Sequence, residues 1–479
     1  MENSSKATFT KARVPVKHPW LAMAGMLMGA FVGMLSETSL NIALPKLEVA
    51  LGVGTSTLQW LVTGYMLVIG IVLPFSSLIS KWFTTRQTII FALCAFILGA
   101  VISALAPNFA IVLTGRMIQG IGTGLILPLM FTVAMQIFPP HKLGAAMGVN
   151  ALVIMFAPAI GPTLTGLLLA KLSWRWIFWA FAIILVVALV FAVLHLKNIA
   201  ELTRPKVDFL SLVSSAVGFG ALVMGASFAS ENGWGSPLVL GLLILGLVVL
   251  VFYVHRQLHL EHPILNLKVF ANPSFRIGAL IVMVDFGVIL SAMYLFPQYI
   301  QNGMGLPVAM TGIIMLPGGV VNAIVSAISG RMYDNFGAQI PARVGFVIAI
   351  IGAVMLIMVQ PDSSIAYVIA AHIILMIGCP LAMSPSQTHA LNALRGPQSA
   401  DGSTIMNTLQ QIVGAIATAL ATSCLVLGQS AYDGGNKQAA FTNGVHYGFY
   451  FTLVLTIIGL ILALMLKRNK PSSDVNFDK

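Results

Sequence analysis

The sequence predicts an all-α polytopic membrane protein with fourteen transmembrane helices, and two observations carry this prediction. Hydrophobic residues make up 58% of the 479 positions and charged residues only 8%, about a third of the charged share of a soluble domain. Uncharged apolar runs of roughly 20 residues, the length that spans a bilayer, follow one another along nearly the whole chain. Because a helix satisfies its own backbone hydrogen bonds away from water, each run predicts a helix.

Charged residues, Pro, Gly and Asn mark the ends of these runs. The first six spans are expected at 20–44, 56–80, 87–105, 110–133, 143–170 and 175–196. The other eight are expected at 208–229, 237–254, 276–299, 309–331, 343–359, 364–387, 402–427 and 446–466. The polar segment 1–19 resembles the start of a secretory signal, but the apolar run behind it is too long for one, so we expect a cytoplasmic leader.

The basic residues predict the orientation of the chain. The formal net charge is +11, and a cytoplasmic residue 1 puts 20 of the 25 Lys and Arg residues on the cytoplasmic side. This asymmetry follows the positive-inside rule and explains the charge better than a nucleic-acid partner does. We therefore expect both termini in the cytoplasm and no nucleic acid bound. We also expect the protein to be a monomer in the lipid bilayer.

Two long charged connections divide the spans into groups. Residues 195–208 follow six spans and residues 255–276 follow eight. The expected divisions are a leader (1–19), a first six-helix bundle (20–196), a linker with two inserted spans (197–274), a second six-helix bundle (275–466) and a cytoplasmic tail (467–479). Transporters built from repeats bind substrate between their halves, so the interface of the bundles is the expected site.

The sequence excludes several classes of chemistry. It contains no HExxH, GxSxG, Walker or dinucleotide-binding motif, so we expect neither an enzyme nor a self-contained ATP-driven pump, and no cofactor. Cys94, Cys379 and Cys424 lie far apart in apolar segments without CxxC or His spacing. We interpret them as inert core thiols and expect no metal site.

Two motifs lie in the first and fourth spans. Residues 35–45 (LSETSLNIALP) place Glu37 and Asn41 on one helical face and close with Ala-Leu-Pro. Residues 113–124 (LTGRMIQGIGTG) surround Arg116 with glycines, which allow neighbouring helices to approach closely.

A third motif lies in the fifth span, at residues 157–166 (APAIGPTLTG). Pro158 and Pro162 break backbone hydrogen bonds and bend the helix, while Gly161 and Gly166 admit close packing. The alternative interpretation is an ordinary kinked transmembrane helix.

A fourth motif, residues 330–337 (GRMYDNFG), is expected as a cytoplasmic turn after the tenth span and contains Gly330, Arg331, Asp334 and Gly337. Its acid can cap or salt-bridge a neighbouring helix in one conformation and release it in another. The corresponding residues 77–84 after the second span lack both glycines and carry Lys81 in place of the acid, so any gating latch must be asymmetric.

These four motifs resemble the major facilitator superfamily, and within it the fourteen-span drug:proton antiporters of the lincomycin-resistance type. The resemblance covers nearly the whole chain. It implies two six-helix halves with an inserted helix pair, and proton-coupled efflux of lipophilic or cationic drugs, with lincosamide antibiotics as candidates, from the plasma membrane of a bacterium. The sequence departs from the family at the 77–84 loop described above and at two further positions: most members carry Asp where Ser36 stands, and one family glycine is Thr165.

Three charges are expected deep in the membrane: Glu37, Arg116 and Asp285. A charge at the bilayer centre costs about 2.5–3.5 kcal/mol on insertion scales, so retained charges usually pair or line an aqueous cavity. At 1.5 Å per residue, Glu37 lies roughly 12 Å below the outer boundary at Pro45, with Arg116 level with it. Asp285 lies roughly 13 Å from Arg276 at the cytoplasmic side.

We interpret Glu37 and Asp285 as groups that bind protons or cationic substrate in a central cavity, with Arg116 modulating their proton affinity. The alternative is a static Glu37–Arg116 ion pair that joins spans one and four. Weaker candidates are polar residues near the acids or in span thirteen, which more often bridge helices than touch substrate: Thr38, Asn41, Gln119, Asn407, Gln410 and Gln411. His372 could titrate near neutrality, but we interpret it as a helix-packing residue.

Other functions remain open at this point. A dedicated exporter of an endogenous lipid, peptide or siderophore fits the same motifs. Nutrient uptake is disfavoured by the span-five motif and by the scarcity of deep polar groups that could bind a sugar. A membrane sensor would be expected to carry a soluble signalling domain, and the sequence predicts none.

Overall fold

The computed structural model describes residues 18–138, 140–198, 208–260, 263, 265–394 and 397–466. Within these residues the chain is helical and contains no strand. The first seven helices are α1 (Pro19–Leu51), α2 (Thr55–Leu58), α3 (Trp60–Trp82), α4 (Thr85–Leu105), α5 (Phe109–Ile137), α6 (Pro140–Lys171) and α7 (Arg175–His195). The hairpin that follows consists of α8 (Phe209–Asn232) and α9 (Pro237–His259).

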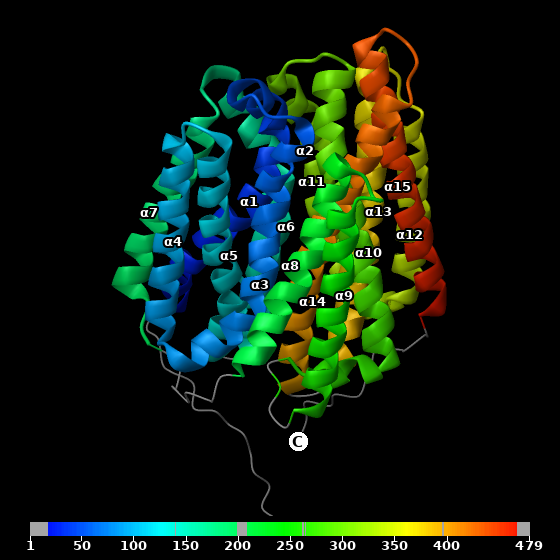
Figure 1. Cartoon of the computed structure of the whole chain (residues 1–479). Helices are drawn as coiled ribbons and strands as arrows, with labels where there is room; N and C mark the ends of the chain where they lie inside the picture. The colour runs from blue at the N-terminus through cyan, green and yellow to red at the C-terminus, as the bar shows by residue number, and fades with distance from the viewer. Residues whose placement is uncertain are drawn as a thin grey trace, which may run out of the picture.

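The remaining helices follow a short 3₁₀-helix, η1 (Leu267–Ala271). They are α10 (Pro273–Gln298), continued by a π-helical turn η2 (Tyr299–Gly303), then α11 (Val308–Phe336), α12 (Gln339–Ile357), α13 (Ile365–Asn392), α14 (Pro397–Ser430) and α15 (Lys437–Met465). Figure 1 shows these helices running side by side, with the described ends of the chain at the same end of the bundle.

The prediction of fourteen spanning segments is confirmed, because each predicted run coincides with one long helix. Thirteen of the described helices are long and apolar enough to cross a membrane, and α6, with 32 residues, is the fourteenth long helix. Several helices extend beyond their predicted ends. α1 passes through Pro45 and reaches Leu51, where Gly52 adopts a left-handed φ of 66° and ends the helix.

Polar side chains fix several helix ends. Thr84 forms a capping box with Gln87 at the start of α4, and the Asn108 side chain accepts a hydrogen bond from the Ile111 backbone at the start of α5. Asn272 caps α10 in the same manner. These caps satisfy backbone N–H groups that the first helical turn leaves without partners.

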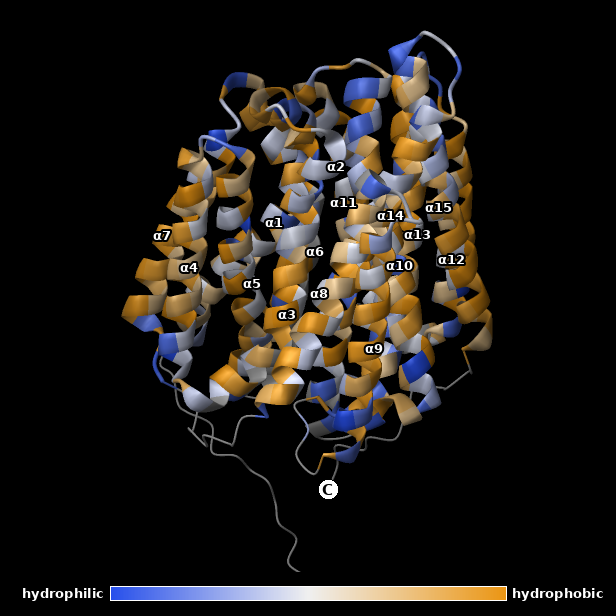
Figure 2. Cartoon of the chain, viewed as in Figure 1, coloured by the Kyte–Doolittle hydropathy of each residue, from blue (hydrophilic) through white to orange (hydrophobic). Residues whose placement is uncertain are grey.

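The outer surface of the helix assembly is apolar. α9 is the clearest case, since only 17% of the residues in its most hydrophobic stretch are buried. Leu247 and Val251 of this helix are 61% and 62% exposed. Figure 2 shows hydrophobic residues over the outside of the long helices and hydrophilic residues gathered at the two ends. An exposed apolar surface of this extent is expected where lipid, not water, surrounds the protein.

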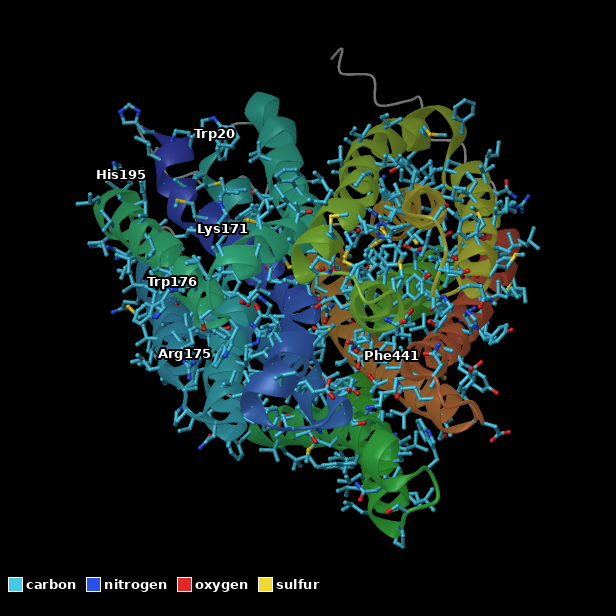
Figure 3. The ribbon with its side chains drawn as sticks, turned by 90° about the horizontal axis from the view of Figure 1, so that it is seen from above. Trp20, Lys171, Arg175, Trp176, His195 and Phe441 are labelled. Carbon is cyan, nitrogen blue, oxygen red and sulfur yellow. The ribbon has the colours of Figure 1, made fainter. Side chains whose placement is uncertain are left out.

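The helices pack as two bundles with a hairpin at their edge. α1 and α3–α7 contact one another in the first bundle, and α10–α15 do so in the second. The bundles meet along two seams, where α3 packs on α14 and α6 packs on α11, and α1 also contacts α10. The hairpin places α8 against both α3 and α14. Figure 3 shows its bright green ribbon at the edge of the assembly.

An ion pair closes the hairpin at the end where the described chain begins and ends. Arg256 donates from Nε and Nη2 to the two carboxylate oxygens of Asp208, at 2.9 and 2.8 Å, and Ser211 also donates to Asp208. These hydrogen bonds, Arg256 first among them, hold the pKa of Asp208 below its usual value. Gln257 donates to Ser211 and accepts from the Leu265 backbone, which ties the hairpin to the segment before η1.

Candidate functional site

Arg116 forms the centre of a buried polar network in the first bundle. Its side chain is fully buried, and its guanidinium donates to the Leu61 carbonyl at 3.0 Å and to Gln119 Oε1 at 2.9 Å. Two further hydrogen bonds reach the hydroxyl and the carbonyl oxygen of Ser36. The guanidinium also lies 3.9 Å from the centre of the Tyr65 ring, within range of a cation–π interaction.

The predicted alternative of a static Glu37–Arg116 ion pair is therefore wrong for this structure. Neither carboxylate oxygen of Glu37 has a hydrogen bond of ordinary geometry to a described residue, in contrast to Asp208, which forms an ion pair with Arg256. Because successive residues on a helix point about 100° apart, Ser36 faces Arg116 and Glu37 cannot point in the same direction. Oxygen atoms of neutral groups hold the cation, and Glu37 interacts with it only at longer range.

Tyr65 connects three helices beside this network. Its hydroxyl donates to the Gly33 carbonyl of α1 at 2.8 Å and lies 2.8 Å from the Thr123 hydroxyl of α5. A Cβ atom at Gly33 would lie 2.8 Å from the Thr123 methyl carbon, so a glycine is required for α1 and α5 to approach this closely. The network thus fixes the position of α1 relative to α3 and α5.

Glu37 faces the seam between the bundles. Its side chain is only 2% exposed, and neither carboxylate oxygen has a hydrogen bond of ordinary geometry to a described residue. The side chain of Gln411, which comes from α14 of the second bundle, approaches this carboxylate. An ionised carboxylate buried without a partner is costly, so this position favours a proton or a cationic ligand.

Asp285 is the buried acid of the second bundle. Its side chain is fully buried on α10, and its oxygens also have no hydrogen bond of ordinary geometry within the described chain. The thiol of Cys379 on α13 approaches it, whereas no Lys or Arg of the described ranges lies within ion-pair distance. The sequence predicts Cys379 to be an inert core thiol. It does not predict that this thiol lies beside Asp285.

The weaker substrate candidates divide into helix bridges and residues with spare hydrogen-bonding capacity. Thr38 of α1 donates to the Pro158 carbonyl of α6 at 3.1 Å and so bridges two helices. Gln119 accepts from Arg116 of its own helix α5, and its Nε2 has no hydrogen-bond partner among the described residues. Asn41 is buried, and its Oδ1 has no hydrogen-bond partner among the described residues. Gln410 is 6% exposed, and Asn407 is half-buried and shares a face of α14 with Gln411, four residues later.

The span-five motif lies where α6 meets α1 and α11. A Cβ atom at Gly161 would lie 2.7 Å from the Thr38 hydroxyl, and one at Gly166 would lie 3.0 Å from the Val308 carbonyl of α11. Thr163, between them, donates to the Gly312 carbonyl at 3.0 Å. Pro158 and Pro162 lie inside the continuous helix α6. The motif therefore brings the backbones of the two bundles together, a role beyond that of an ordinary helix kink.

The motif at 330–337 is helical and not the turn that we predicted. α11 continues through Gly330 to Phe336, and only Gly337, with a φ of 69°, leaves the helix. The reason is local: the positive φ of Gly337, which glycine adopts readily, takes the chain out of the helix, whereas Gly330 has no positive φ. The side chains of Arg331 and Asp334 lie outside the described part of the structure, so their predicted gating role stays a prediction.

The π-helical turn η2 makes a polar contact between the bundles near the other end of the assembly. Met304 donates its backbone N–H to the Tyr299 carbonyl, five residues earlier, at 2.9 Å. The Gln301 side chain donates to the Ile42 carbonyl of α1 at 3.0 Å. Such turns often lie at functional positions in helices. This contact is not predicted by the sequence, in which Pro297 is the one local signal of an irregular helix end.

The chain matches the family model described as the Major Facilitator Superfamily over residues 26–418. It is 43% identical over 455 residues to the lincomycin resistance protein LmrB of Listeria innocua, covering 94% of this chain and 97% of the relative. The chain belongs to the Major Facilitator Superfamily. It is also 44% identical over 480 residues to the lincomycin resistance protein LmrB of Bacillus subtilis, covering 98% and 99% of the two chains.

The fold agrees with this membership. A crystal structure of the peptide transporter POT in complex with sulfate matches with a TM-score of 0.67 at 14% identity, over 94% of this chain and 97% of that one. The protein is thus a multi-pass major facilitator transporter related to drug-resistance proteins, and it is not an enzyme. The family predicted from the four motifs is confirmed.

His372 packs between helices of the second bundle of this major facilitator protein. Its ring is buried and stacks on Phe296 of α10, with centroids 4.4 Å apart and an interplanar angle of 16°. A Cβ atom at Gly318 of α11 would collide with the ring. Across the described residues, no group of three or more His, Cys, Asp or Glu side chains is arranged to hold a metal ion.

Proposed function

We propose that this protein is a proton-coupled multidrug efflux antiporter that works by alternating access. The observation that carries the proposal is a pair of fully buried carboxylates, Glu37 and Asp285, one in each bundle and each without a hydrogen bond of ordinary geometry within the described chain. A carboxylate in such surroundings gains from a proton or a cation. If a proton and a cationic substrate bind these carboxylates in turn, movement of protons into the cell would be coupled to movement of the substrate out of it.

Alternating access needs a region that can close and open between the bundles. The α6–α11 seam supports such a movement. Gly166 and Gly312 let the backbones of the two helices pack directly on each other, so few interlocked side chains would have to separate. Gln301 adds a single hydrogen bond from η2 to α1. Rocking of one bundle against the other would break these contacts and expose Glu37, which is approached by Gln411 of α14, to the opposite side of the membrane.

For the substrate we propose lipophilic or cationic drugs, with lincosamides among them. The relatives named for lincomycin resistance are 43% and 44% identical over nearly the whole chain, which supports this class. Asn41, one turn from Glu37, and Asn407 and Gln410 of α14 supply polar groups, and the 24 Met and 27 Phe residues of the chain suit an adaptable apolar cavity. Their role in substrate binding is part of the proposal.

We further propose that the transporter is a monomer in a bacterial plasma membrane with both termini in the cytoplasm. The excess of Lys and Arg at that end supports the orientation. A membrane potential then contributes about 2.3 kcal/mol per charge per 100 mV to net inward movement of protons. A dedicated exporter of an endogenous lipid, peptide or siderophore is the second candidate, and the same acids would serve it.

The test is a transport assay in a pump-deficient bacterial host and in everted vesicles. Wild-type protein should lower susceptibility to lincomycin or a lipophilic cation, and the substrate should evoke proton release from energised vesicles. Glu37→Gln and Asp285→Asn, expressed at wild-type levels, should each reduce this release at least ten-fold, because an amide cannot exchange a proton.

Glu48→Gln is the matched control, since it makes the same change on α1, where Glu48 accepts a hydrogen bond from Thr55. It should behave as wild type. Full proton-driven efflux by both amide variants would overturn the coupling assignment. Unchanged susceptibility to every compound together with no proton release would overturn multidrug antiport itself.

A further inference from the structure

A cavity that neither buried acid lines lies where the α8–α9 hairpin meets η1 and α14. Its volume is about 550 Å³, within the range of pockets that bind small molecules. Phe219 and Leu250 of the hairpin, Phe270 of η1, and Ile405 and Leu409 of α14 are among its walls. The proposed transport function uses none of these residues.

The cavity borders the lipid near one polar boundary of the membrane. Val254 and Leu258, which line it, are 42% and 38% exposed on α9, the helix with the most exposed apolar surface. Both lie within one turn of Arg256, whose ion pair with Asp208 belongs to the polar end of the hairpin. A lipid molecule of that leaflet can therefore reach the cavity sideways, without passing between the bundles.

The lining favours hydrocarbon over water. Most of the described residues that line the cavity are Leu, Val, Ile, Phe or Ala. The Thr408 hydroxyl donates to the Thr404 carbonyl at 2.8 Å and leaves its methyl group for the wall. A buried water needs two to four polar partners, and a surface of this composition offers few, whereas an acyl chain needs none.

One charged side chain gives the cavity a polarity. Lys268 of η1 lines it and is exposed, and no carboxylate of the described residues lies within ion-pair distance of its ammonium group. A cation beside an apolar slot at the level of the headgroups complements a lipid with a negatively charged phosphate headgroup. The net-negative lipids of the leaflet fit this arrangement better than zwitterionic ones, whose own cation competes with Lys268.

We propose that this cavity binds one anionic phospholipid, with an acyl chain among Leu250, Phe270 and Leu409 and the headgroup phosphate on Lys268. The bound lipid would touch α8, α9, η1 and α14 at once, and so would hold the hairpin on the second bundle. The site is distinct from the proposed transport site, and its occupancy does not require the protein to export drugs.

The test is native mass spectrometry of the full chain released from bilayers of equal phosphatidylglycerol and phosphatidylcholine. Wild-type protein should retain one phosphatidylglycerol in preference to phosphatidylcholine. Lys268→Gln should lower this preference at least ten-fold, and Val254→Trp, which fills the mouth of the cavity, should abolish retention of that lipid. Both substitutions lie at exposed positions, so folding is checked by the melting temperature and elution of each variant.

Two variants serve as matched controls. Arg276→Gln removes an exposed cation of α10 outside the cavity, and Val251→Trp adds the same bulk one turn away on α9. Both should retain the lipid as wild type does. Equal retention of the two lipids, or equal losses in the cavity and control variants, would overturn the proposal. Displacement of the retained lipid by lincomycin would also overturn it and assign the cavity to substrate.

Discussion

Glu37 and Asp285 are both buried carboxylates at the interior of a helix bundle, but their surroundings differ. Glu37 has a fixed cation in its bundle, because four hydrogen bonds and the Tyr65 ring hold Arg116 in place. Asp285 has the Cys379 thiol beside it and no described cation within ion-pair distance. An ionised Glu37 is therefore partly compensated by its own protein, whereas an ionised Asp285 depends on a ligand. The comparison points to unequal roles for the two acids, and four predictions test it.

The largest effect is expected from Arg116→Met. It removes the donor of four hydrogen bonds and leaves buried oxygen atoms and Glu37 without the cation, a loss of about 3–5 kcal/mol for a broken buried network. We expect low yield and a strongly lowered melting temperature in detergent, measured by fluorescence-detected elution after heating. Arg116→Lys should fall between, since an ammonium group cannot reproduce the guanidinium fork. A melting temperature equal to wild type would show that the network does not stabilise the bundle.

The second test compares the stabilities of Glu37→Gln and Asp285→Asn. The first should lower the melting temperature by a few degrees, because it removes the attraction between Glu37 and Arg116. The second should leave it unchanged or raise it, because no fixed charge of the described chain compensates Asp285. Thermal unfolding of the two variants at pH 8 measures the difference, and the reverse order would refute the comparison.

A smaller effect on transport is expected from Gln411→Leu, which removes the amide that approaches Glu37 across the seam. A contact of about 1 kcal/mol corresponds to a roughly five-fold lower rate of substrate efflux. Cys379→Ser, which keeps a small polar group beside Asp285, should change the rate less than two-fold. If the two variants had equal effects, the seam would not distinguish Glu37 from Asp285.

The smallest effect on stability is expected from Asp208→Asn. Asp208 serves as the reference acid, because Arg256 and Ser211 both donate hydrogen bonds to its carboxylate. Hydrogen bonds from Arg256 hold the pKa of Asp208 below its usual value, so the folded state stabilises the ionised form. This stabilisation is present above about pH 4, the usual pKa of Asp, and is lost as the pH falls through the lower value of the folded protein. The variant should melt slightly below wild type at pH 7, and the difference should shrink in acid. A difference that persists at pH 3 would contradict this account.

The sequence predicted the fold well because a bilayer imposes a direct rule on it. Every spanning segment must be apolar and helical, so hydropathy located all fourteen helices. The ends were less certain. α1 continues through Pro45, since proline can be accommodated inside a helix where neighbouring groups compensate, and the helix then stops at Gly52.

The sequence predicted how deep in the membrane the site residues lie, but not which neighbouring helix each side chain faces. Spacing along the chain placed Glu37 and Arg116 at one level, and the Arg116 contact with Ser36 agrees with that depth. Which side chain faces which helix depends on how α1 is rotated in its bundle, and packing of Gly33 on Thr123 decides that rotation. The Leu61 carbonyl could not be anticipated as an acceptor, because every residue carries one.

The π-helical turn η2 has a consequence for how sequences of this kind can change. A π turn accommodates one residue more than the α-helical turn it replaces, as a single-residue insertion into a helix does. Removing one residue from 299–303 would restore the α-helical pitch of this turn. The residues of the turn that follow the deletion would then rotate by about 100° about the helix axis. Gln301 would then turn away from Ile42, while α10 below it, including Asp285, would keep its alignment. A one-codon deletion could thus alter the contact between the bundles without touching either buried acid.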